Sequence, residues 1–521
     1  MCAHNNLMTR IFFIFPVVTG FLLWLSFPGG GGIWPILFVA LIPFLAVIRK
    51  GSPKEAGMYG FTAGIVHFLF LLYWIVIVLS RYGGLHWSIS VVALILLASY
   101  MSVYFALFGL LARYIFLALP VGAVLWLLPT LWVGIDWIRG ILFTGLPWMD
   151  LGYGLWEQTG FIQIADLFGH HGVTWLIVFI NTLLAILLTK RQSIKTVCFL
   201  TMSFVLVFAS STVYSKWRTA EISLALSDHS IKKMRVGIVQ GNIDQSIKWS
   251  GPQQRDTVDR YLSLSRALLH DNSLEMLVWP ETALPFYPRN NEYMQSLQSM
   301  TAESGSALLT GAPWYEIIDR EARKVKFFNS ALLLNPAGRL GGKYYKTHLV
   351  PFGEYVPLKA LLPFLAPLVE AAGDFSPGKI ENPLVWRDSR IGVLICFESV
   401  FPEISRKWVL SGANMLVNLT NDAWYGRSSA PYHSLAMSVF RAVESRRSLI
   451  RSANTGISAF ITPLGNVEAR SELFEPYGFS ADVVLYGEKT FWARYGYLFG
   501  PLCFLLGVAA SFVAIMRRRY C

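Results

Sequence analysis

The sequence predicts a multi-pass α-helical membrane domain of about eight spans, joined to an α/β domain outside the membrane. Three observations lead to this fold class. The 521 residues are 54% hydrophobic and only 15% charged, which is too apolar for an ordinary soluble protein. Long apolar stretches fill the N-terminal part and recur near the C-terminus. Between them lies a polar segment in which β-rich runs alternate with helix-like runs.

Seven of the predicted spans lie in the N-terminal part. No charged residue occurs from position 11 to 48, and Pro28 with the four glycines after it interrupts this run, which predicts two helices joined by a tight turn. Further spans are predicted at 58–80, 87–112, 120–137, 173–188 and 197–212, and the eighth at 491–516; the second and sixth are shorter than a typical span. A cleaved signal peptide is the alternative for the first span, but no small-residue cleavage site follows it.

The placement of positive charge orients these spans, because Lys and Arg accumulate in short cytoplasmic loops. Positive residues follow the second, fourth, sixth and eighth spans: Arg49, Lys50, Lys54, Arg113, Lys190, Arg191, Lys195, Arg517, Arg518 and Arg519. We therefore expect both termini in the cytoplasm and the polar segment in the periplasm of a bacterium, with the chain in its inner membrane. Because much of the net charge of +12 flanks the spans, no nucleic-acid partner is expected.

This orientation divides the chain into three parts. Residues 1–213 are the N-terminal transmembrane domain with seven spans, residues 214–490 are the periplasmic domain, and residues 491–521 are the last span with a basic cytoplasmic tail. Within the periplasmic domain, strands are predicted at 235–240, 276–279, 307–310, 331–335, 391–395 and 415–419, and helices at 253–270 and 432–448.

Cys396 is the first candidate for chemistry. The five cysteines, Cys2, Cys198, Cys396, Cys503 and Cys521, form no CxxC pair and no metal-ligand spacing, so neither a disulfide framework nor a metal site is indicated. Cys396 alone lies in the periplasmic domain, directly after the apolar run 391–395, where a strand end would expose a nucleophile. A small buried hydrophobic residue is the equally common alternative.

Two further residues complete a chemically coherent set. Glu281 follows the apolar run before Trp279-Pro280, where a partly desolvated carboxylate could act as a general base. Lys346 could stabilise an oxyanion, with the backbone N–H of Phe397 as a second donor. Taken singly, each is more often a solvated surface residue, and Lys343 offers an equivalent charge nearby. The mechanism needs no histidine, so structural roles are expected for His348 and His433.

The motifs around these residues resemble known ones. The Glu-Lys-Cys signature of the nitrilase superfamily is similar to Val278-Trp-Pro-Glu281, Tyr345-Lys346-Thr-His-Leu-Val-Pro-Phe-Gly-Glu354-Tyr-Val-Pro357 and Leu394-Ile-Cys396-Phe-Glu398. Together with the spans, other segments resemble the apolipoprotein N-acyltransferases: Gln240-Gly-Asn242, Lys248-Trp249, Asn418-Leu-Thr-Asn421-Asp422-Ala-Trp424 and Arg451-Ser-Ala-Asn454-Thr-Gly456. The likeness covers nearly the whole chain.

This resemblance implies an αββα sandwich and assigns roles in the site. Glu281 would be the base, Lys346 the oxyanion support and Cys396 the nucleophile, while Glu354 would help to hold Lys346 and the intermediate. Glu398, two residues after the nucleophile, would be a supporting residue. The chain departs from the family pattern at Phe397, where the family carries tyrosine, so a hydroxyl contact is missing there.

The resemblance also extends to three substrate-binding positions, each with an alternative. Trp249 and Trp148, in Gly145-Leu-Pro147-Trp148, resemble family positions near the lipid entrance, but a tryptophan at this depth is more often an interfacial anchor. Glu444 matches a family position, but an ion pair with Arg441 or Arg447 would also explain it. An apolar lid on the bilayer, or ordinary core, is expected from Leu361, Leu362, Phe364, Leu365 and Leu368.

The function implied is acyl transfer without a cofactor. A phospholipid would donate an acyl chain to Cys396, and the α-amine of the N-terminal diacylglyceryl-cysteine of an apolipoprotein would accept it. A monomer is the default expectation for the oligomeric state. A membrane-anchored nitrilase-like amidase is the main alternative, although a tether needs only one span. A second alternative is a lipid-binding or transport protein without enzymatic activity. Such a protein would be expected to lack at least one residue of the Glu-Lys-Cys set, but all three are present.

Overall fold

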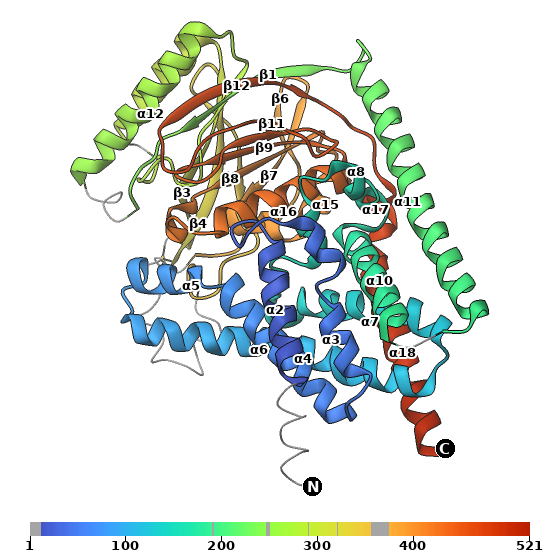
Figure 1. The fold of residues 1–521 in the computed structure, drawn as a ribbon. Coiled ribbons are helices and arrows are strands. Elements are labelled where there is room, and N and C mark those ends of the chain that lie inside the picture. Colours follow the sequence, from blue (N-terminus) through green and yellow to red (C-terminus); the bar gives the residue numbers. More distant parts are fainter. Residues whose placement is uncertain are drawn as a thin grey trace.

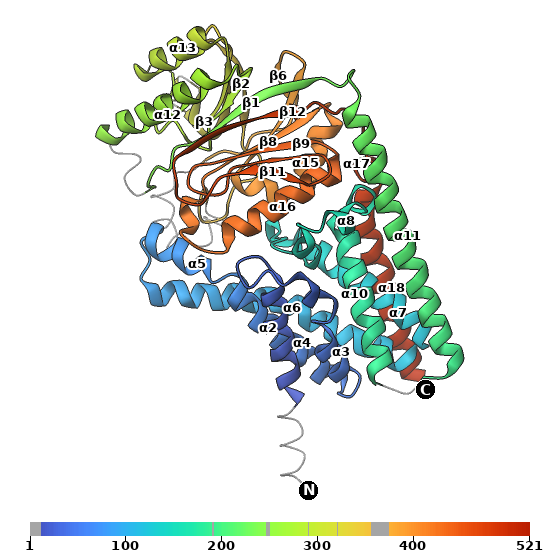
Figure 2. The ribbon, with the colours of Figure 1, turned by 45° about the horizontal axis from the view of Figure 1, so that its top comes forward.

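The computed structural model describes residues 12–189, 192–245, 251–289, 291–319, 321–322, 324–355 and 375–520. Membrane-type helices form one end of the molecule and two stacked β-sheets form the other (Figure 1). The long helix α11 (Ile194–Ser227) runs along the side of both parts, as the turned view shows (Figure 2).

The helical end combines long helices with short connecting ones. They are α2 (Ile14–Ser26), η1 (Trp34–Phe38), α3 (Ile42–Ile48), α4 (Pro53–Leu71), α5 (Trp74–Ile77), η2 (Val78–Tyr82), α6 (Trp87–Ala118), α7 (Val121–Arg139), η3 (Leu142–Thr144), η4 (Leu151–Leu155), α8 (Thr159–Ile162), α9 (Ala165–Phe168), α10 (His170–Thr189), α11, α17 (Phe491–Arg494), η8 (Gly496–Leu498) and α18 (Phe499–Tyr520).

Every apolar stretch of the sequence prediction lies in this helical part, which confirms a multi-pass helical domain. Among the described residues, five helices are long and apolar enough to cross a membrane, and the pair α4 with α5–η2, bent by 48°, is a sixth candidate if it is counted as one span. The first two stretches form the shorter helices Ile14–Ser26 and Trp34–Ile48. A 13-residue helix is only about 20 Å long, so the number of eight spans stays a prediction.

Local sequence explains how the spans begin and pack. α4 begins at a capping box, because the Ser52 side chain accepts a hydrogen bond from the Glu55 backbone while Glu55 accepts one from the Ser52 N–H. α4 and α6 then approach closely at glycines. A Cβ on Gly60 would lie 2.1 Å from the Phe105 oxygen, and one on Gly109 would lie 2.2 Å from the Ala56 oxygen. Small residues therefore set this helix–helix distance.

The other end of the molecule holds two six-stranded sheets and the helices on their outer faces. The first sheet has the order β12-β1-β2-β3-β4-β5 and the second β11-β10-β9-β8-β7-β6. The strands are β1 (Lys233–Gln240), β2 (Met276–Val278), β3 (Ala307–Asp319), β4 (Lys324–Leu334), β5 (Leu340–Tyr345), β6 (Leu384–Trp386), β7 (Ser389–Ile395), β8 (Met415–Thr420), β9 (Ser448–Ala453), β10 (Ala459–Ile461), β11 (Val467–Arg470) and β12 (Tyr477–Val484). Helices α12 (Gly251–Asp271) and α13 (Tyr293–Ser304) accompany the first sheet, and η6 (Cys396–Val400), α15 (Pro402–Leu410), η7 (Asp422–Tyr425) and α16 (Ala430–Ser445) the second.

Both faces of the first sheet are apolar, because alternate residues point to opposite sides of a strand. Leu277 packs in the core under α12 and α13, whereas its neighbours Met276 and Val278 pack in the core shared with the second sheet. Strands buried on both faces read as continuous apolar runs, which is how they are recognised in the sequence. The expected αββα sandwich is confirmed.

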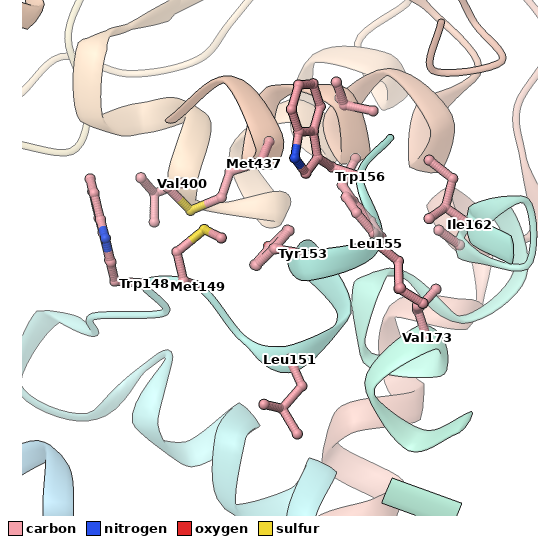
Figure 3. Packing of buried hydrophobic residues seen from close by; sticks show 14 of the residues in the cluster. Trp148, Met149, Leu151, Tyr153, Leu155, Trp156, Ile162, Val173, Val400 and Met437 are labelled. Atoms are coloured by element: carbon pink, nitrogen blue, oxygen red, sulfur yellow. The ribbon is translucent and has the colours of Figure 1, made fainter. Parts of the chain in front are cut away.

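No loop separates the helical part from the α/β part at the predicted boundary, position 214. α11 continues as one helix past position 214 and ends at Ser227, and β1 begins at Lys233. The limits 1–213, 214–490 and 491–521 stay a prediction. The segment after α7 also reaches the second sheet's helices: Trp148, Met149 and Tyr153 pack beside Val400 and Met437 (Figure 3).

Candidate active site

Three strand ends bring Glu281, Lys346 and Cys396 together. Glu281 comes three residues after β2, while Lys346 and Cys396 directly follow β5 and β7. The Lys346 Nζ lies 3.8 Å from Glu281 Oε1 and 2.9 Å from Glu354 Oε2. Glu281 and Lys346 both influence the pKa of the Cys396 thiol, so the three predicted residues share one site.

Glu281 is a buried carboxylate, and its two oxygens differ in their hydrogen bonding. Its Oε1 accepts a hydrogen bond of 2.8 Å from Asn329 Nδ2, and within the described part of the chain its Oε2 has no hydrogen-bond partner. Burial raises the pKa of Glu281, and the charge of Glu354 adds to this, against the opposing charge of Lys346. A carboxylate with a raised pKa and an open oxygen is suited to accept a proton.

Lys346 and Glu354 form a buried ion pair that Asn329 joins to Glu281. The Asn329 Nδ2 lies 2.8 Å from Glu354 Oε1 as well as from Glu281 Oε1, and Glu354 Oε2 also accepts from the Val350 N–H at 2.9 Å. Burial alone would lower the pKa of Lys346, but the two carboxylates outweigh it, so this pKa is raised and the lysine stays a cation. Asn329 was missed by sequence reasoning; its one signal is a polar residue inside the apolar strand β4.

Cys396 has a strained backbone conformation, and its thiol is protonated. Its φ is +53°, a left-handed value that is costly for a non-glycine residue. The pKa of the thiol is raised to about 12, first by burial and then by the charge of Glu281, while Lys346 opposes the shift. The thiol therefore keeps its proton at rest, and a base must remove it during attack.

Glu398 connects the nucleophile to the loop that carries Lys346. Its Oε2 accepts from the Ile395 N–H at 2.7 Å, and its Oε1 accepts from Tyr344 Oη at 2.8 Å and from the Thr347 N–H at 2.6 Å. The side chain is fully buried, and burial raises its pKa. Glu398 therefore links the turn at Cys396 to the segment around Lys346 by hydrogen bonds.

The two histidines near the site, His348 and His433, make packing and hydrogen-bond contacts with their surroundings. The His348 ring packs against Phe401 at 3.9 Å between centroids, and burial lowers the pKa of His348 to about 4. The His433 Nε2 bonds the Pro28 oxygen at 2.9 Å, and burial lowers the pKa of His433 to about 3. Both rings are therefore neutral at physiological pH.

Comparisons with known proteins match both parts of the chain. Residues 19–183 match the family described as the apolipoprotein N-acyltransferase N-terminal domain, and residues 235–484 match the carbon-nitrogen hydrolase family. An apolipoprotein N-acyltransferase from Geobacter metallireducens is 38% identical over 97% of this chain and 96% of its own length. The chain belongs to the apolipoprotein N-acyltransferase family.

More distant relatives agree in length as well as in name. The apolipoprotein N-acyltransferase of Chlorobaculum tepidum is 29% identical over 99% of both chains, and that of Pasteurella multocida is 30% identical over 93% of this chain and 92% of its own. Among solved structures, an amidase from a Nesterenkonia species is 19% identical, with a TM-score of 0.37, and covers 50% of this chain and 93% of its own.

Trp148 lies in an aromatic cluster beside the nucleophile. It is only 1% exposed, its ring stacks near Phe397 at 6.4 Å, and its Nε1 donates to His433 Nδ1 at 3.1 Å. Trp74 and Tyr425 complete the cluster. The expectation of an interfacial anchor at Trp148 is therefore wrong, because protein covers the ring on all sides. Substrate binding by Trp148 stays a prediction.

Glu444 lies in a buried network of charges. It forms an ion pair of 2.8 Å with Arg441 Nε and accepts from the His170 N–H at 2.8 Å. The alternative of ion pairing thus explains its burial, and a contact with substrate stays a prediction. Trp249 and the expected lid residues Leu361, Leu362, Phe364, Leu365 and Leu368 lie outside the described residues.

One cluster among the described residues has the geometry of a possible metal site. The ligand atoms of Asp150, His170 and His171 lie within 4.8 Å of one another. Both ring nitrogens of His170 are already bonded, to Asp150 at 2.9 Å and to Glu444 at 3.2 Å, and Arg139 pairs with Asp150. This cluster is therefore an internal ion-pair network that joins the membrane helices to α16.

Proposed function

We propose that this chain transfers an acyl chain from a phospholipid to the α-amino group of the N-terminal diacylglyceryl-cysteine of apolipoproteins, through a thioester on Cys396. The observation that carries the proposal is a Glu-Lys-Cys site in a chain that matches apolipoprotein N-acyltransferases along nearly its whole length. An acyl donor and an acceptor that are both lipids also suit an enzyme with several membrane helices.

The first half-reaction forms the thioester. Glu281 takes the thiol proton as the Cys396 Sγ attacks the ester carbonyl carbon of the phospholipid, and Lys346 with the Phe397 N–H stabilises the resulting oxyanion. The ester C–O bond then breaks, and Glu281 returns the proton to the departing lysophospholipid oxygen. The acyl chain is left on the cysteine as a thioester.

The second half-reaction forms the amide. The α-amine of the acceptor attacks the thioester carbonyl, Glu281 removes its proton, and Cys396 leaves as a thiolate that regains the proton. Glu354 and Glu398 act on the residues around the reaction rather than on the acyl group, since they hold Lys346 and the turn at Cys396. We assign substrate contacts to Trp148, Trp249 and Glu444, and because one chain supplies the whole Glu-Lys-Cys set we propose a monomer.

A transfer assay tests this function against the amidase alternative. The detergent-purified chain is incubated with phospholipid and a diacylglyceryl-cysteinyl peptide, and a peptide with an acetylated α-amine serves as the matched control. We expect the free-amine peptide to gain the mass of one acyl chain and the acetylated peptide to gain none. Hydrolysis of a simple amide at a rate that phospholipid does not change, without peptide acylation, would establish the amidase instead.

We also propose that the chain lies in a bacterial inner membrane with the catalytic domain in the periplasm and both termini in the cytoplasm. The distribution of Lys and Arg around the spans supports this orientation. In a chain otherwise free of cysteine, a membrane-impermeant maleimide should label Asp388→Cys in spheroplasts. It should label Ser193→Cys, just before the first residue of α11, only after lysis. The reverse pattern would overturn the orientation.

A further inference from the structure

A row of buried polar residues crosses the second sheet just behind the nucleophile. In the parallel register of β7, β8 and β9, Leu394 pairs with Asn418 and Asn418 pairs with Arg451. Asn418 and Arg451 are both fully buried, although β8 and β9 are otherwise core strands. A guanidinium in such a place needs partners for its donors and its charge, and the partners show what it does.

The first partner connects Arg451 to the backbone of the catalytic turn. The Arg451 Nη1 donates to Asn418 Oδ1 at 2.5 Å. The Asn418 amide in turn donates to the Leu394 oxygen at 3.0 Å and to the Cys396 oxygen at 3.4 Å. The guanidinium therefore reaches the carbonyl of the nucleophile itself through a single side chain, at a residue whose positive φ must be held in place.

The second partner is the buried carboxylate of Asp422. The Arg451 Nη2 lies 2.7 Å from Asp422 Oδ2, and the Thr420 hydroxyl bonds Asp422 Oδ1 at 2.9 Å. The position of this carboxylate is confined, because a Cβ on Gly456 would lie 2.0 Å from Asp422 Oδ2. The Asp422 carboxylate is thus packed against Gly456 and held by Arg451 and Thr420.

We propose that Arg451 is a positioning residue for acyl transfer, which holds the Cys396 turn through Asn418 and offsets the charge of Asp422. This inference rests on the proposed function and adds a residue to its machinery. The charged groups that face the thiol are then Glu281, Lys346 and Asp422, with the Thr420 hydroxyl as a neutral contact. Of these, the negative charge of Asp422 is the one that Arg451 balances directly.

The direction of the electrostatic effect follows from these contacts. Asp422 raises the pKa of the Cys396 thiol, since a nearby negative charge disfavours the thiolate. Loss of Arg451 leaves that charge without compensation, so the thiol should lose its proton less readily. Removal of both charges should reverse most of the effect, whereas a purely structural role would make the double variant worse than either single one.

The test measures thiol reactivity without any lipid. In the full-length chain with the other four cysteines replaced by serine, iodoacetamide alkylation of Cys396 is followed by mass spectrometry as a function of pH. For Arg451→Met we expect alkylation about tenfold slower at a given pH, with the pH profile moved upward by about one unit. Arg451→Met with Asp422→Asn should return within about threefold of wild type.

Arg447→Met is the matched control. Arg447 is equally buried in the neighbouring turn, but among the described residues it bonds only backbone carbonyls, such as those of Ala413 and Gly487. Its loss should leave the pH profile of alkylation in place. A wild-type profile in Arg451→Met, or a double variant as slow as Arg451→Met, would overturn the inference. Because alkylation needs no acyl donor, failure of the transfer assay with this reactivity pattern intact would contradict the proposed function alone.

Discussion

Two lysines three residues apart differ completely in their surroundings. Lys346 is 1% exposed between Glu281 and Glu354, whereas the side chain of Lys343 is 37% exposed and pairs with Glu316 on the surface. If a buried cation between two carboxylates is removed, water does not compensate the carboxylates that remain. If an exposed cation is removed, water solvates its former partner. The same residue type is therefore proposed to act in the reaction at position 346 and is an exposed surface charge at position 343.

The first prediction compares these lysines. Lys346→Ala should lower the rate of acyl transfer by at least about 100-fold, because the oxyanion loses a donor and two buried carboxylates lose their counter-ion. Lys343→Ala should stay within about threefold of wild type. Initial rates with the diacylglyceryl peptide measure both. Wild-type activity in Lys346→Ala would remove that lysine from the mechanism and make Lys343 the next candidate.

The pH dependence provides the second prediction. Glu281 must be ionised to accept a proton, and its pKa is raised above its ordinary value of 4.5. Activity should therefore fall, about tenfold per pH unit, as the pH drops through a value above 4.5. A profile of kcat/KM against pH measures this limb, and Glu281→Gln should be inactive throughout. Full activity down to pH 4.5 would exclude Glu281 as the base.

At this scale the sequence predicted the candidate reacting residues and, through the family resemblance, Glu354 and Glu398 beside them, but it did not predict Asn329 or Arg451. Glu281, Lys346 and Cys396 stand in motifs that follow apolar runs, so both their chemistry and their place at strand ends could be expected. Asn329 and Arg451 lie inside strands, and their partners come from other strands. Only the three-dimensional register shows which groups they meet.

Among the elements, the close approach of β3 to the turn after β2 constrains the position of Glu281, the proposed base. Gly311 on β3 lies so close to this turn that an added Cβ would be 2.6 Å from Glu281 Cα and 2.4 Å from the Thr282 nitrogen. No larger residue fits without movement of the backbone that carries Glu281. The strand therefore positions the carboxylate by direct contact.

The third prediction is that Gly311→Ala displaces the base. We expect acyl transfer to fall about 100-fold, since a shift near 1 Å in a catalytic group has an effect of that size. Gly341→Ala on β5 is the control, because its nearest contact would be an ordinary 3.5 Å to the Leu333 oxygen. Steady-state rates distinguish the two variants, and equal activity of both would show that the turn after β2 can adapt.

The sequence predicted which elements exist more accurately than their lengths. Strands expected at 307–310 and 331–335 are parts of the longer hairpin β3 (Ala307–Asp319) and β4 (Lys324–Leu334). Their outer halves are polar or exposed, so the apolar pattern ended before the hydrogen-bonded ladder did. α11 likewise extends beyond its apolar stretch, and its later turns pack against Leu464 and Tyr486 of the catalytic domain.

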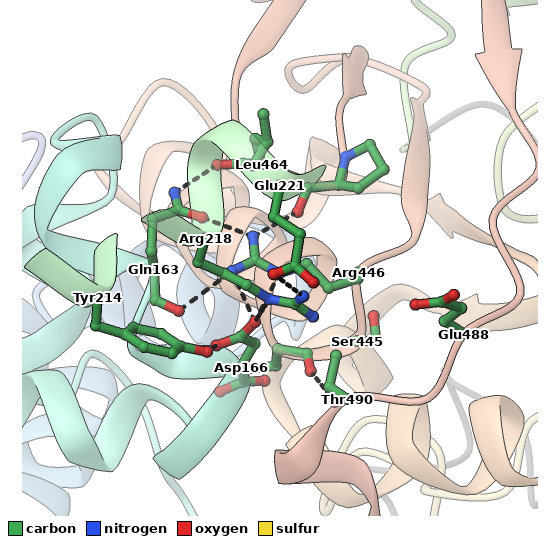
Figure 4. A network of polar contacts seen from close by, with 12 residues as sticks. Gln163, Asp166, Tyr214, Arg218, Glu221, Ser445, Arg446, Leu464, Glu488 and Thr490 are labelled. Carbon is green, nitrogen blue, oxygen red and sulfur yellow. Dashed lines mark hydrogen bonds and ion pairs between the residues drawn. The ribbon is translucent and has the colours of Figure 1, made fainter. Parts of the chain in front are cut away.

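For the whole molecule, a buried ionic junction joins the catalytic domain to the membrane helices. Asp166 on α9 accepts from Arg446 at the end of α16, and from Tyr214 and Arg218 on α11 (Figure 4). Arg446 also bonds Gln163 Oε1 at 2.6 Å. Because these residues are far apart in the sequence, no local pattern could predict that they meet.

The fourth prediction concerns this junction. Asp166→Ala leaves Arg446 buried without its counter-ion and should destabilise the protein by about 3–5 kcal/mol. Glu221, whose own side chain is 45% exposed, pairs with Arg218. Glu221→Ala should lower the free energy of unfolding by at most about 1 kcal/mol. Thermal unfolding in detergent, followed by tryptophan fluorescence, should show a much lower midpoint for Asp166→Ala only. Equal midpoints would mean that water compensates Arg446.

The central claim is that Cys396 carries the acyl chain, and intact-protein mass spectrometry after incubation with phospholipid alone tests it most directly. With no acceptor present, we expect an adduct of one fatty acyl mass on the wild-type chain, removed by neutral hydroxylamine as thioesters are. Cys396→Ser should show no hydroxylamine-labile adduct. Absence of any adduct on the wild-type chain with several phospholipids, or a labile adduct that persists in Cys396→Ser, would contradict the account.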